Sequence, residues 1–457
     1  MNKKISVGLA ITIAILAMTV TFSVTMILAG RMFNNTVSSV KEKENMYSKL
    51  AEIDKYVRDN AYVEINDETL YDTMASGYVL GTGDRSAVYY TAKAYEEIQD
   101  IADGTLMGIG VDVVKDASGS ARIIKVYDES PAREAGLEQN GYITAIDGVD
   151  VKGLTRENVQ SRLRGESGTS VTITYLNPMS EESQITLTRS KYNIPSVEYQ
   201  LLGSNMGYVQ ITAFNNNTAS QLEYAIHQLT SAGAAGIVFD VRNTAGGSLD
   251  AAVECVSLIV PEGDVVSAEY KDGTVEVLGS SDDDELNLPM TVLVNGSTSY
   301  SAELFAATVR DFEKGRVVGV KTAGKGTIQA SPSQLEDGSA VVITVARMLT
   351  STGECFDGVG VTPDVEYALT SEQEQSFYDM TPDTDPQVTR CCEVLAQQIA
   401  QSGAGGEDVN VNEPIVDEGT EGGEDTPAEG GEDAPTEGGE DAPAEGGEDG
   451  SAEGADE

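Results

Sequence analysis

The sequence is poor in histidine: His227 is the only one among 457 residues. A Ser-His-Asp triad would have to use it. It lies within residues 221–229, whose spacing is that of an ordinary surface helix, so a solvent-facing side chain is the better interpretation. A metal site is equally hard to build without further histidines or paired cysteines. A hydrolytic site in this chain would therefore need a lysine or a carboxylate as its general base.

Cysteines are few, and their spacing fits no metal or disulfide framework. No C-x-x-C pair occurs, and two of the cysteines are adjacent, which argues against both a zinc site and a disulfide scaffold. We expect buried or incidental thiols. The four are Cys255, Cys355, Cys391 and Cys392. The nucleotide-binding patterns G-x-x-x-x-G-K-[ST] and G-x-G-x-x-G are also missing, and no cofactor is expected.

Positive charge is scarce, since 29 Lys and Arg face 75 Asp and Glu, for a net charge of −46. This balance argues against nucleic acid as a partner. Residues 402–457 hold 20 Asp or Glu and no Lys or Arg, and Gly-Gly-Glu-Asp recurs there at 422, 430, 438 and 446. With so few apolar side chains, the tail at residues 403–457 is predicted to be disordered. A solvated spacer and a ligand for cation-rich surfaces both stay open as its role.

One long apolar run lies at the amino end, from Ile5 to Gly30. At about 1.5 Å per residue it can span a hydrocarbon core of ~30 Å. It ends at Arg31 without a small-x-small cleavage site, which favours an uncleaved transmembrane anchor (residues 1–31) over a cleaved signal peptide. Lys3 and Lys4 place the amino terminus in the cytoplasm and all that follows outside it.

The rest of the chain changes pattern twice. Residues 32–102 show apolar positions at helical spacing. Residues 103–192 carry short β-like runs separated by Gly, Asp and Asn, and we expect one convincing helix among them, Arg156–Leu163. Residues 193–370 alternate apolar strands with helices, which predicts an α/β core.

A helical segment follows at residues 371–402. Its last helix is expected at Pro386–Ile399, with Asp385 as the N-cap. Within the core, we predict strands that include Ile237–Val241 and Val341–Ala346, and a helix at Ala302–Asp311.

Lys325 lies in a glycine-flanked turn, Thr-Ala-Gly-Lys-Gly-Thr-Ile-Gln at residues 322–329, with no acid beside it. A lysine acts as a general base near pH 7 only if its pKa falls from about 10.4 by roughly three units, which burial without a carboxylate partner achieves. Glycines on both sides let the backbone pass close to a substrate. The same pattern also suits a simple turn.

Two further segments lead into predicted helices. In Asp240–Gly247 the N–H groups of Gly246 and Gly247 can point the same way and hold a developing oxyanion, although a plain connection is the alternative. In the second segment, residues 295–305, a serine before a helix gains from the helix N-terminal field when its oxygen becomes anionic. Serines in that position are also ordinary N-caps.

Together and in this order, these segments resemble the carboxy-terminal processing peptidases over about residues 45–400. The similar parts include Asp-x-Arg-Asn-x-x-Gly-Gly at 240–247, the serine-rich loop before Glu303, Lys325 with Gln329, and residues 356–364. The resemblance implies a multidomain α/β fold, with a ClpP/crotonase-like protease core, an inserted PDZ β-domain and a helical N-terminal region, to which the apolar run adds one N-terminal transmembrane helix. It also implies a serine endopeptidase with a Ser/Lys dyad. Together with the predicted anchor, this places a membrane-anchored peptidase outside the cytoplasm.

Residues 103–192 are similar to a PDZ domain, and Gly108, Ile109, Gly110 and Val111 match its carboxylate-binding loop. Successive N–H groups of that loop would cap a free C-terminal carboxylate, while the peptide adds a strand to the sheet edge. The expected partners are therefore polypeptides with free C-termini, and a homo-oligomer stays open.

The resemblance breaks at one position. In the family the nucleophilic serine stands three residues before the glutamate that here is Glu303, and this position holds Tyr300. In one interpretation the loop shifts by one residue, and Ser301, favoured over Ser299, presents its hydroxyl to Lys325. In the other, Tyr300 fills the nucleophile position and the protein binds C-termini without cleaving them.

The family roles of the neighbouring residues follow the first interpretation. The N–H of Ala302 would join that of Gly247 in the oxyanion hole, and Gln329 would orient Lys325.

Overall fold

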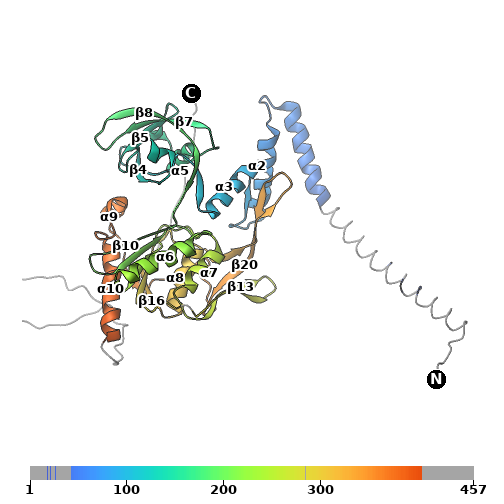
Figure 1. Cartoon of the computed structure of the whole chain (residues 1–457). Helices are drawn as coiled ribbons and strands as arrows, with labels where there is room; N and C mark the ends of the chain where they lie inside the picture. The colour runs from blue at the N-terminus through green and yellow to red at the C-terminus, as the bar shows by residue number, and fades with distance from the viewer. Residues whose placement is uncertain (1–17, 19–20, 22–25, 27–42, 284, 404–457) are drawn as a thin grey trace, which may run out of the picture. The chain divides into compact units, whose positions relative to one another are not determined.

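The computed structural model describes residues 18, 21, 26, 43–283 and 285–403 (Figure 1). The chain divides into two units, residues 1–405 and 406–457. Among the described residues, no helix is both long and apolar enough to cross a membrane. The predicted anchor, apart from three of its residues, and the predicted acidic tail lie outside the described residues. Both stay predictions, as do the domain boundaries.

A six-stranded sheet forms the centre of residues 193–370, with strands in the order β10-β11-β12-β15-β16-β21. β10 is antiparallel to β11, and the other neighbours are parallel. Every residue of β12 and β15 is buried, as expected for parallel strands covered on both faces. The strands are β10 (Val197–Leu201), β11 (Gly207–Ile211), β12 (Ile237–Asp240), β15 (Met290–Val294), β16 (Gly315–Gly319) and β21 (Val365–Glu366).

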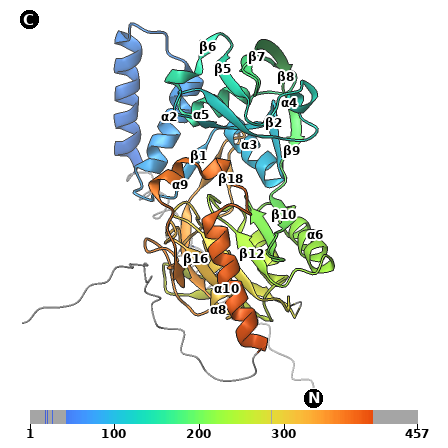
Figure 2. The same cartoon turned by 90° about the vertical axis from the view of Figure 1, so that its left-hand side faces the viewer.

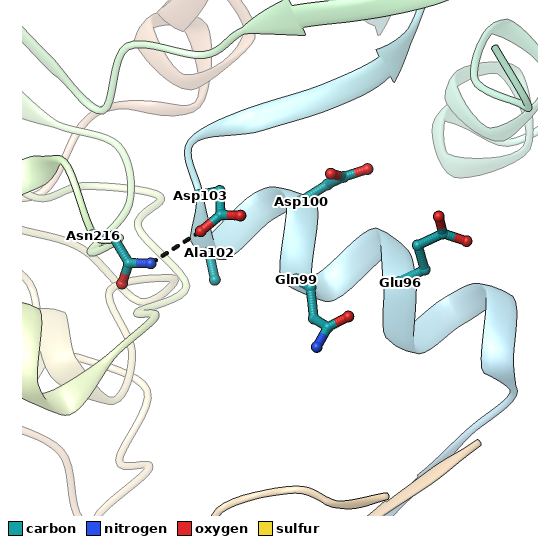
Figure 3. A pocket seen from close by; sticks show the side chains of 6 residues that line it. All are labelled: Glu96, Gln99, Asp100, Ala102, Asp103 and Asn216. Atoms are coloured by element: carbon teal, nitrogen blue, oxygen red, sulfur yellow. Dashed lines mark hydrogen bonds between the residues drawn. The ribbon is translucent and has the colours of Figure 1, made fainter. Parts of the chain in front are cut away.

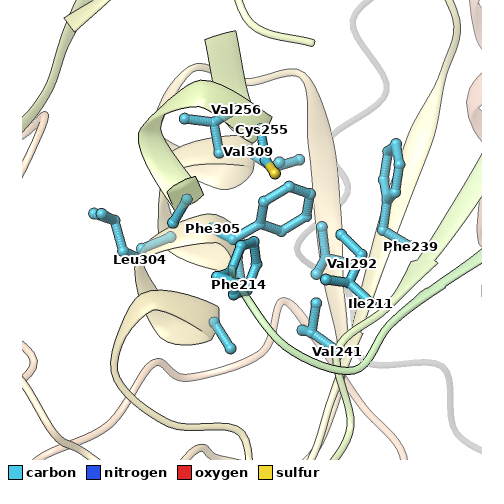
Figure 4. Close-up of a cluster of buried hydrophobic side chains, with 14 of the residues drawn as sticks. Ile211, Phe214, Phe239, Val241, Cys255, Val256, Val292, Leu304, Phe305 and Val309 are labelled. Carbon is cyan, nitrogen blue, oxygen red and sulfur yellow. The ribbon is translucent and has the colours of Figure 1, made fainter. Parts of the chain in front are cut away.

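Helices cover both faces of this sheet because its apolar side chains alternate. Phe239 and Val292 point to one face, where they pack with Phe305 and other side chains of α6 (Thr218–Ser231), α7 (Leu249–Ser257) and α8 (Ser301–Asp311) (Figure 4). Val238 and Leu293, one residue along each strand, pack on α10 (Pro386–Gly403), which Figure 2 shows in front of the sheet. The α/β prediction is confirmed, and Asp385 accepts from Gln387 N at 2.8 Å as the expected N-cap of α10.

The structure also contains a second sheet, in the order β14-β13-β20-β17, which the strand–helix alternation of the sequence did not predict. Its strands are β13 (Gly263–Tyr270), β14 (Val275–Ser281), β17 (Thr327–Gln329) and β20 (Thr344–Thr350). The predicted strand Val341–Ala346 is wrong as one element, because the chain leaves one sheet and enters another within it. β19 (Ala340–Val342) pairs with β1 (Val88–Tyr90) and β18 (Ser333–Gln334), and β20 begins after Ile343.

Residues 43–102 are mainly helical apart from β1, with a helix at 43–60, α2 (Asp67–Leu80) and α3 (Ala92–Ala102). Residues 103–192 form the expected β-rich domain, whose main sheet runs β3-β4-β5-β7-β8, with β6 beside β5. The predicted helix α5 (Arg156–Leu163) is confirmed with the same bounds.

The remaining elements are short or belong to this β-rich domain and the C-terminal segment. They are β2 (Thr105–Gly108), β3 (Val111–Lys115), β4 (Ala121–Val126), α4 (Pro131–Glu134), β5 (Tyr142–Ile146), β6 (Val149–Asp150), η1 (Val151–Gly153), β7 (Ser170–Leu176), β8 (Glu182–Thr188), β9 (Ser190–Asn193), α9 (Ser371–Gln375) and η2 (Phe377–Asp379).

Candidate active site

A sharp strand-to-helix corner lies between β15 and α8. Tyr300, immediately before α8, has φ 55° and ψ −115°. A bulky residue rarely adopts a positive φ, and such strain recurs where a chain must display one side chain between a strand and a helix. The residue displayed at this corner is therefore Tyr300, the position that the resemblance assigns to the nucleophile.

Ser301 has the opposite environment. It is the first residue of α8 and is fully buried. In the described part of the chain its hydroxyl has no hydrogen-bond partner. A Cβ built on Gly246 would lie 3.1 Å from Ser301 Oγ, so the hydroxyl lies against that glycine. Ser299 is half-buried, and its N–H donates to Thr244 O at 3.0 Å.

Lys325 faces the tyrosine instead of a serine. Its side chain is exposed, and Nζ lies 5.4 Å from the centroid of the Tyr300 ring, within the range of a cation–π contact. Burial, with a smaller contribution from the charge of Asp250, raises the pKa of the Tyr300 phenol, which is therefore protonated at neutral pH. Among the described residues, Lys325 makes no hydrogen bond to Ser301 or Ser299, so the choice of nucleophile stays a prediction.

Glu303 connects the corner at Tyr300 to the turn that carries Lys325, residues 322–329. Its fully buried carboxylate accepts from Tyr300 N at 2.9 Å and from Lys325 N at 2.8 Å through the same oxygen, Oε2. The other oxygen, Oε1, accepts from Gly324 N at 2.7 Å and from the Thr322 hydroxyl. The bond to Tyr300 N is half of a capping box, in which the residue at N3 reaches back to the helix start. The sequence signal for this role is the position of Glu303 three residues after the corner, which is where the acid of a capping box stands.

Residues 356–361 form hydrogen bonds with the turn that carries Lys325. Thr322 and Val361 exchange hydrogen bonds, since Thr322 N donates to Val361 O at 3.2 Å and Val361 N donates to Thr322 Oγ1 at 2.7 Å. Gly326 N donates to Asp357 Oδ1 at 3.0 Å. The family-like signature is thus the surface on which the Lys325 turn lies. Gln329 Nε2 donates to Thr327 Oγ1 at 2.9 Å, and in the described part of the chain no hydrogen bond joins Gln329 to Lys325.

The Gly246-Gly247 segment lies beside the corner, as an oxyanion site requires. Phe214 N donates to Gly246 O and Ser248 N donates to Phe214 O, so this pairing leaves the N–H of Gly247 unused. Gly247 has φ 139°, a conformation that L side chains rarely adopt. The N–H of Ala302, the third predicted donor to the oxyanion, already has a partner, because it donates to Ser299 O at 3.2 Å.

A buried ion network holds the strand end that precedes this loop. Arg242 Nη2 lies 2.6 Å from Asp240 Oδ2, and Arg242 Nη1 lies 2.8 Å from Asp385 Oδ2 at the start of α10. Tyr208 Oη donates to Asp240 Oδ2 at 2.8 Å. Local spacing in the sequence does not reveal this role, because Asp385, the partner that completes the network, lies more than a hundred residues further along the chain.

The predicted carboxylate-binding loop connects β2 and β3. Ile109 O accepts from Ala132 N at 2.8 Å, and Gly110 O accepts from Tyr127 N at 3.0 Å. Gly110 has φ 82°, and a Cβ there would overlap the Ser130 side chain, so only glycine fits. The loop carbonyls are thus bound within the domain.

A cavity lies beside α3. It has a volume of about 510 Å³ and is lined by α3 and Asn216, whose side chain donates to Asp103 Oδ1 at 3.1 Å (Figure 3). None of the predicted site residues lines it. His227 is exposed, as predicted, and Cys255, Cys355, Cys391 and Cys392 are free thiols.

Comparisons with known proteins agree with this arrangement. The pattern for peptidase family S41 matches residues 205–367, and that for the PDZ domain matches residues 122–177. A carboxyl-terminal-processing protease of Synechocystis is 32% identical over 314 residues, which cover 67% of this chain and 72% of the relative. This chain belongs to the carboxy-terminal processing peptidases of family S41.

Further relatives of the peptidase have the same description. The carboxy-terminal processing protease CtpA of Bacillus subtilis is 27% identical over 368 residues, covering 80% of this chain and 78% of the relative. Among solved structures, the photosystem II D1 C-terminal processing protease overlaps with a TM-score of 0.46 at 25% identity, covering 76% of this chain and 91% of that one. The peptidase thus combines a mixed α/β serine-peptidase core with a PDZ domain.

Proposed function

We propose that this peptidase is anchored by residues 5–30, works outside the cytoplasm, and cleaves polypeptides whose free C-termini its PDZ domain holds. The lysines ahead of the apolar run and its length support the anchor and its orientation. The match of residues 122–177 to PDZ domains supports capture of C-termini.

In the proposed reaction a Ser301 hydroxyl attacks the scissile carbonyl carbon and Lys325 takes its proton. The C–N bond then breaks, the leaving amine receives a proton from Lys325, and water releases the acyl group. The N–H of Gly247 stabilises the oxyanion. The observation that carries the proposal is Glu303, because one carboxylate oxygen binds both Tyr300 N and Lys325 N and so holds the corner beside the base.

This chemistry requires a change at the corner. Ser301 Oγ, now buried against Gly246, has to turn toward Lys325 as the loop shifts by one residue. Bound substrate would exclude water from Lys325.

The test is cleavage of an unstructured peptide with an apolar, free C-terminus by the full-length protein in mild detergent. We expect Ser301→Ala and Lys325→Ala each to lower kcat/KM by at least ~100-fold, the lower end of what a nucleophile–base pair contributes, and Ser299→Ala to have little effect. Full activity in Lys325→Ala would exclude this mechanism.

A second candidate function is C-terminus binding without cleavage. The family assignment favours an active enzyme, and one observation favours the alternative: the strained corner displays a protonated phenol, which is a poor nucleophile toward amides. In that case wild-type protein binds the same peptide and does not turn it over, and Tyr300→Ser gains cleavage. Cleavage by the wild type that is lost in Ser301→Ala and kept in Tyr300→Phe would contradict it.

A further inference from the structure

At one edge of the PDZ sheet, no other strand of the described residues pairs with the outermost strand. β3 is the last strand in the order β3-β4-β5-β7-β8. The bond from Tyr127 N to Gly110 O makes Val111 and Val126 a pair that exchanges no hydrogen bonds, so the polar groups of Val111 point away from β4. Val113 lies opposite Ile123, whose N–H bonds to Gly141, and it also presents its polar groups to the free edge.

The carbonyl groups on this edge already have partners. Gln160 Nε2 donates to Val111 O at 2.7 Å, and Arg156 Nε donates to Val113 O at 2.8 Å. Both donors come from α5, one turn apart, and so lie on the same face of that helix. Two side chains of the domain therefore occupy the places along β3 that an added strand would use.

An added strand needs the same positions. A peptide that extends the sheet donates its own N–H groups to these carbonyls and lies in the space between β3 and α5. Unpaired strand edges also invite indiscriminate pairing, which natural proteins prevent by covering the edge. Side chains on a helix can leave by rotation, whereas a strand or loop would have to unfold.

We propose that Arg156 and Gln160 form a displaceable cap on the peptide-binding edge of the PDZ domain. The inference rests on the proposed function, that this domain binds free C-termini. The cap sets a threshold: a peptide enters when its carboxylate contacts at the Gly108–Val111 loop, together with its strand pairing, outweigh the two side-chain hydrogen bonds. Arg156 and Gln160 thus weaken the binding of every extended segment at this edge, so that segments without a free carboxylate fall below the threshold before true C-termini do.

The experiment measures binding of a fluorescein-labelled decapeptide with an apolar C-terminal residue, as the free acid and as the C-terminal amide. The protein is the full-length chain in mild detergent, with Lys325→Ala present throughout so that no probe is consumed. Gln160→Met keeps the side-chain length and removes the donor, and Arg156→Met does the same for the second position. Ser161→Ala, at an exposed position of the same helix, is the matched control.

We expect each cap variant to bind the free acid roughly 2- to 10-fold more tightly, the effect of one net hydrogen bond, and the control to bind as before. The amide should gain at least as much, so that selectivity for the free acid does not rise. Unchanged or weaker binding of the free acid by both cap variants overturns the cap while leaving C-terminus binding intact. Absence of binding by every variant overturns the proposed C-terminus recognition and the cap with it.

Discussion

At the scale of single residues, adjacent positions of the corner have opposite surroundings. Tyr300 is displayed beside Lys325, while the Ser301 hydroxyl is buried without a partner. All five residues from 297 to 301 carry a hydroxyl group, so the sequence alone does not indicate which hydroxyl faces Lys325. The two side chains differ because Tyr300 precedes helix α8, whereas Ser301 is its first residue and points its side chain into the core.

Glu303 is the residue whose replacement should matter most to the corner. Glu303→Gln keeps the size but replaces one acceptor oxygen with an NH₂ group that faces N–H donors. Each buried donor left unpaired costs about 1–3 kcal/mol, so we expect the free energy of unfolding to fall by that amount or more and cleavage to fall with it. Urea denaturation followed by circular dichroism measures the loss. Glu313→Gln, at an exposed position just after α8, is the control and should be neutral.

At the scale of elements, the strand ends of the parallel sheet are tied to distant segments. Arg242 connects the end of β12 to Asp385 at the start of α10, and its side chain is only 3% exposed. Such a network gives the loop that carries Gly246 and Gly247 a defined starting point. Loop geometry at this site is therefore decided partly by the C-terminal helix.

The Arg242 network offers a matched comparison with a surface ion pair. Removing one partner of a buried pair leaves a buried charge, so Arg242→Met is expected to lower the free energy of unfolding by about 3–5 kcal/mol. Arg316 lies 3.8 Å from Asp364 with its side chain 48% exposed, and Arg316→Met should cost less than ~1 kcal/mol. Urea midpoints of the two variants check this. Equal losses would mean that the buried network does not stabilise the fold.

A second element-scale contact gives a pH dependence. Asp84 accepts from Thr344 N at 2.8 Å and from Ser86 N at 3.0 Å, which joins the turn after α2 to the start of β20. Burial acts to raise the pKa of Asp84, but these hydrogen bonds outweigh it and lower the pKa below its ordinary value.

The sign of the Asp84 effect follows from that direction. The folded pKa lies below the unfolded value of about 3.9, so the stabilisation is present above that pH and is lost as pH falls through the folded pKa. We expect Asp84→Asn to be less stable than wild type at pH 6 and the difference to shrink at pH 3, measured by urea denaturation at both values. A difference that grows on acidification would contradict the assignment.

At the scale of the whole molecule, every residue assigned a role in peptide capture or cleavage lies between positions 103 and 403. The acidic repeat at residues 404–457 adds charge and no candidate catalytic group. We expect a chain that ends at residue 403 to cleave the test peptide with unchanged kcat/KM, compared with the full-length protein in the same detergent. Loss of cleavage on this deletion would instead favour a function that depends on the tail.

Much of the architecture could be predicted from local patterns. The α5 bounds, the buried strands and the N-cap at Asp385 depend on neighbours within a few residues, and the structure confirms them. The second sheet and the β1–β19 pairing could not be predicted, because each depends on partners far apart in the chain that local spacing does not reveal.

The composition already limits the chemistry of the site: with a single histidine, the general base has to be a lysine or a carboxylate, and we propose Lys325. Tyr300 occupies the family's nucleophile position whatever the fold. The tertiary structure alone decides which side chain faces that lysine. Glu303 bonds both Tyr300 N and Lys325 N, and burial of the apolar face of α8 fixes the register of the helix. For both reasons, Tyr300 takes the strained corner and Ser301 turns into the core.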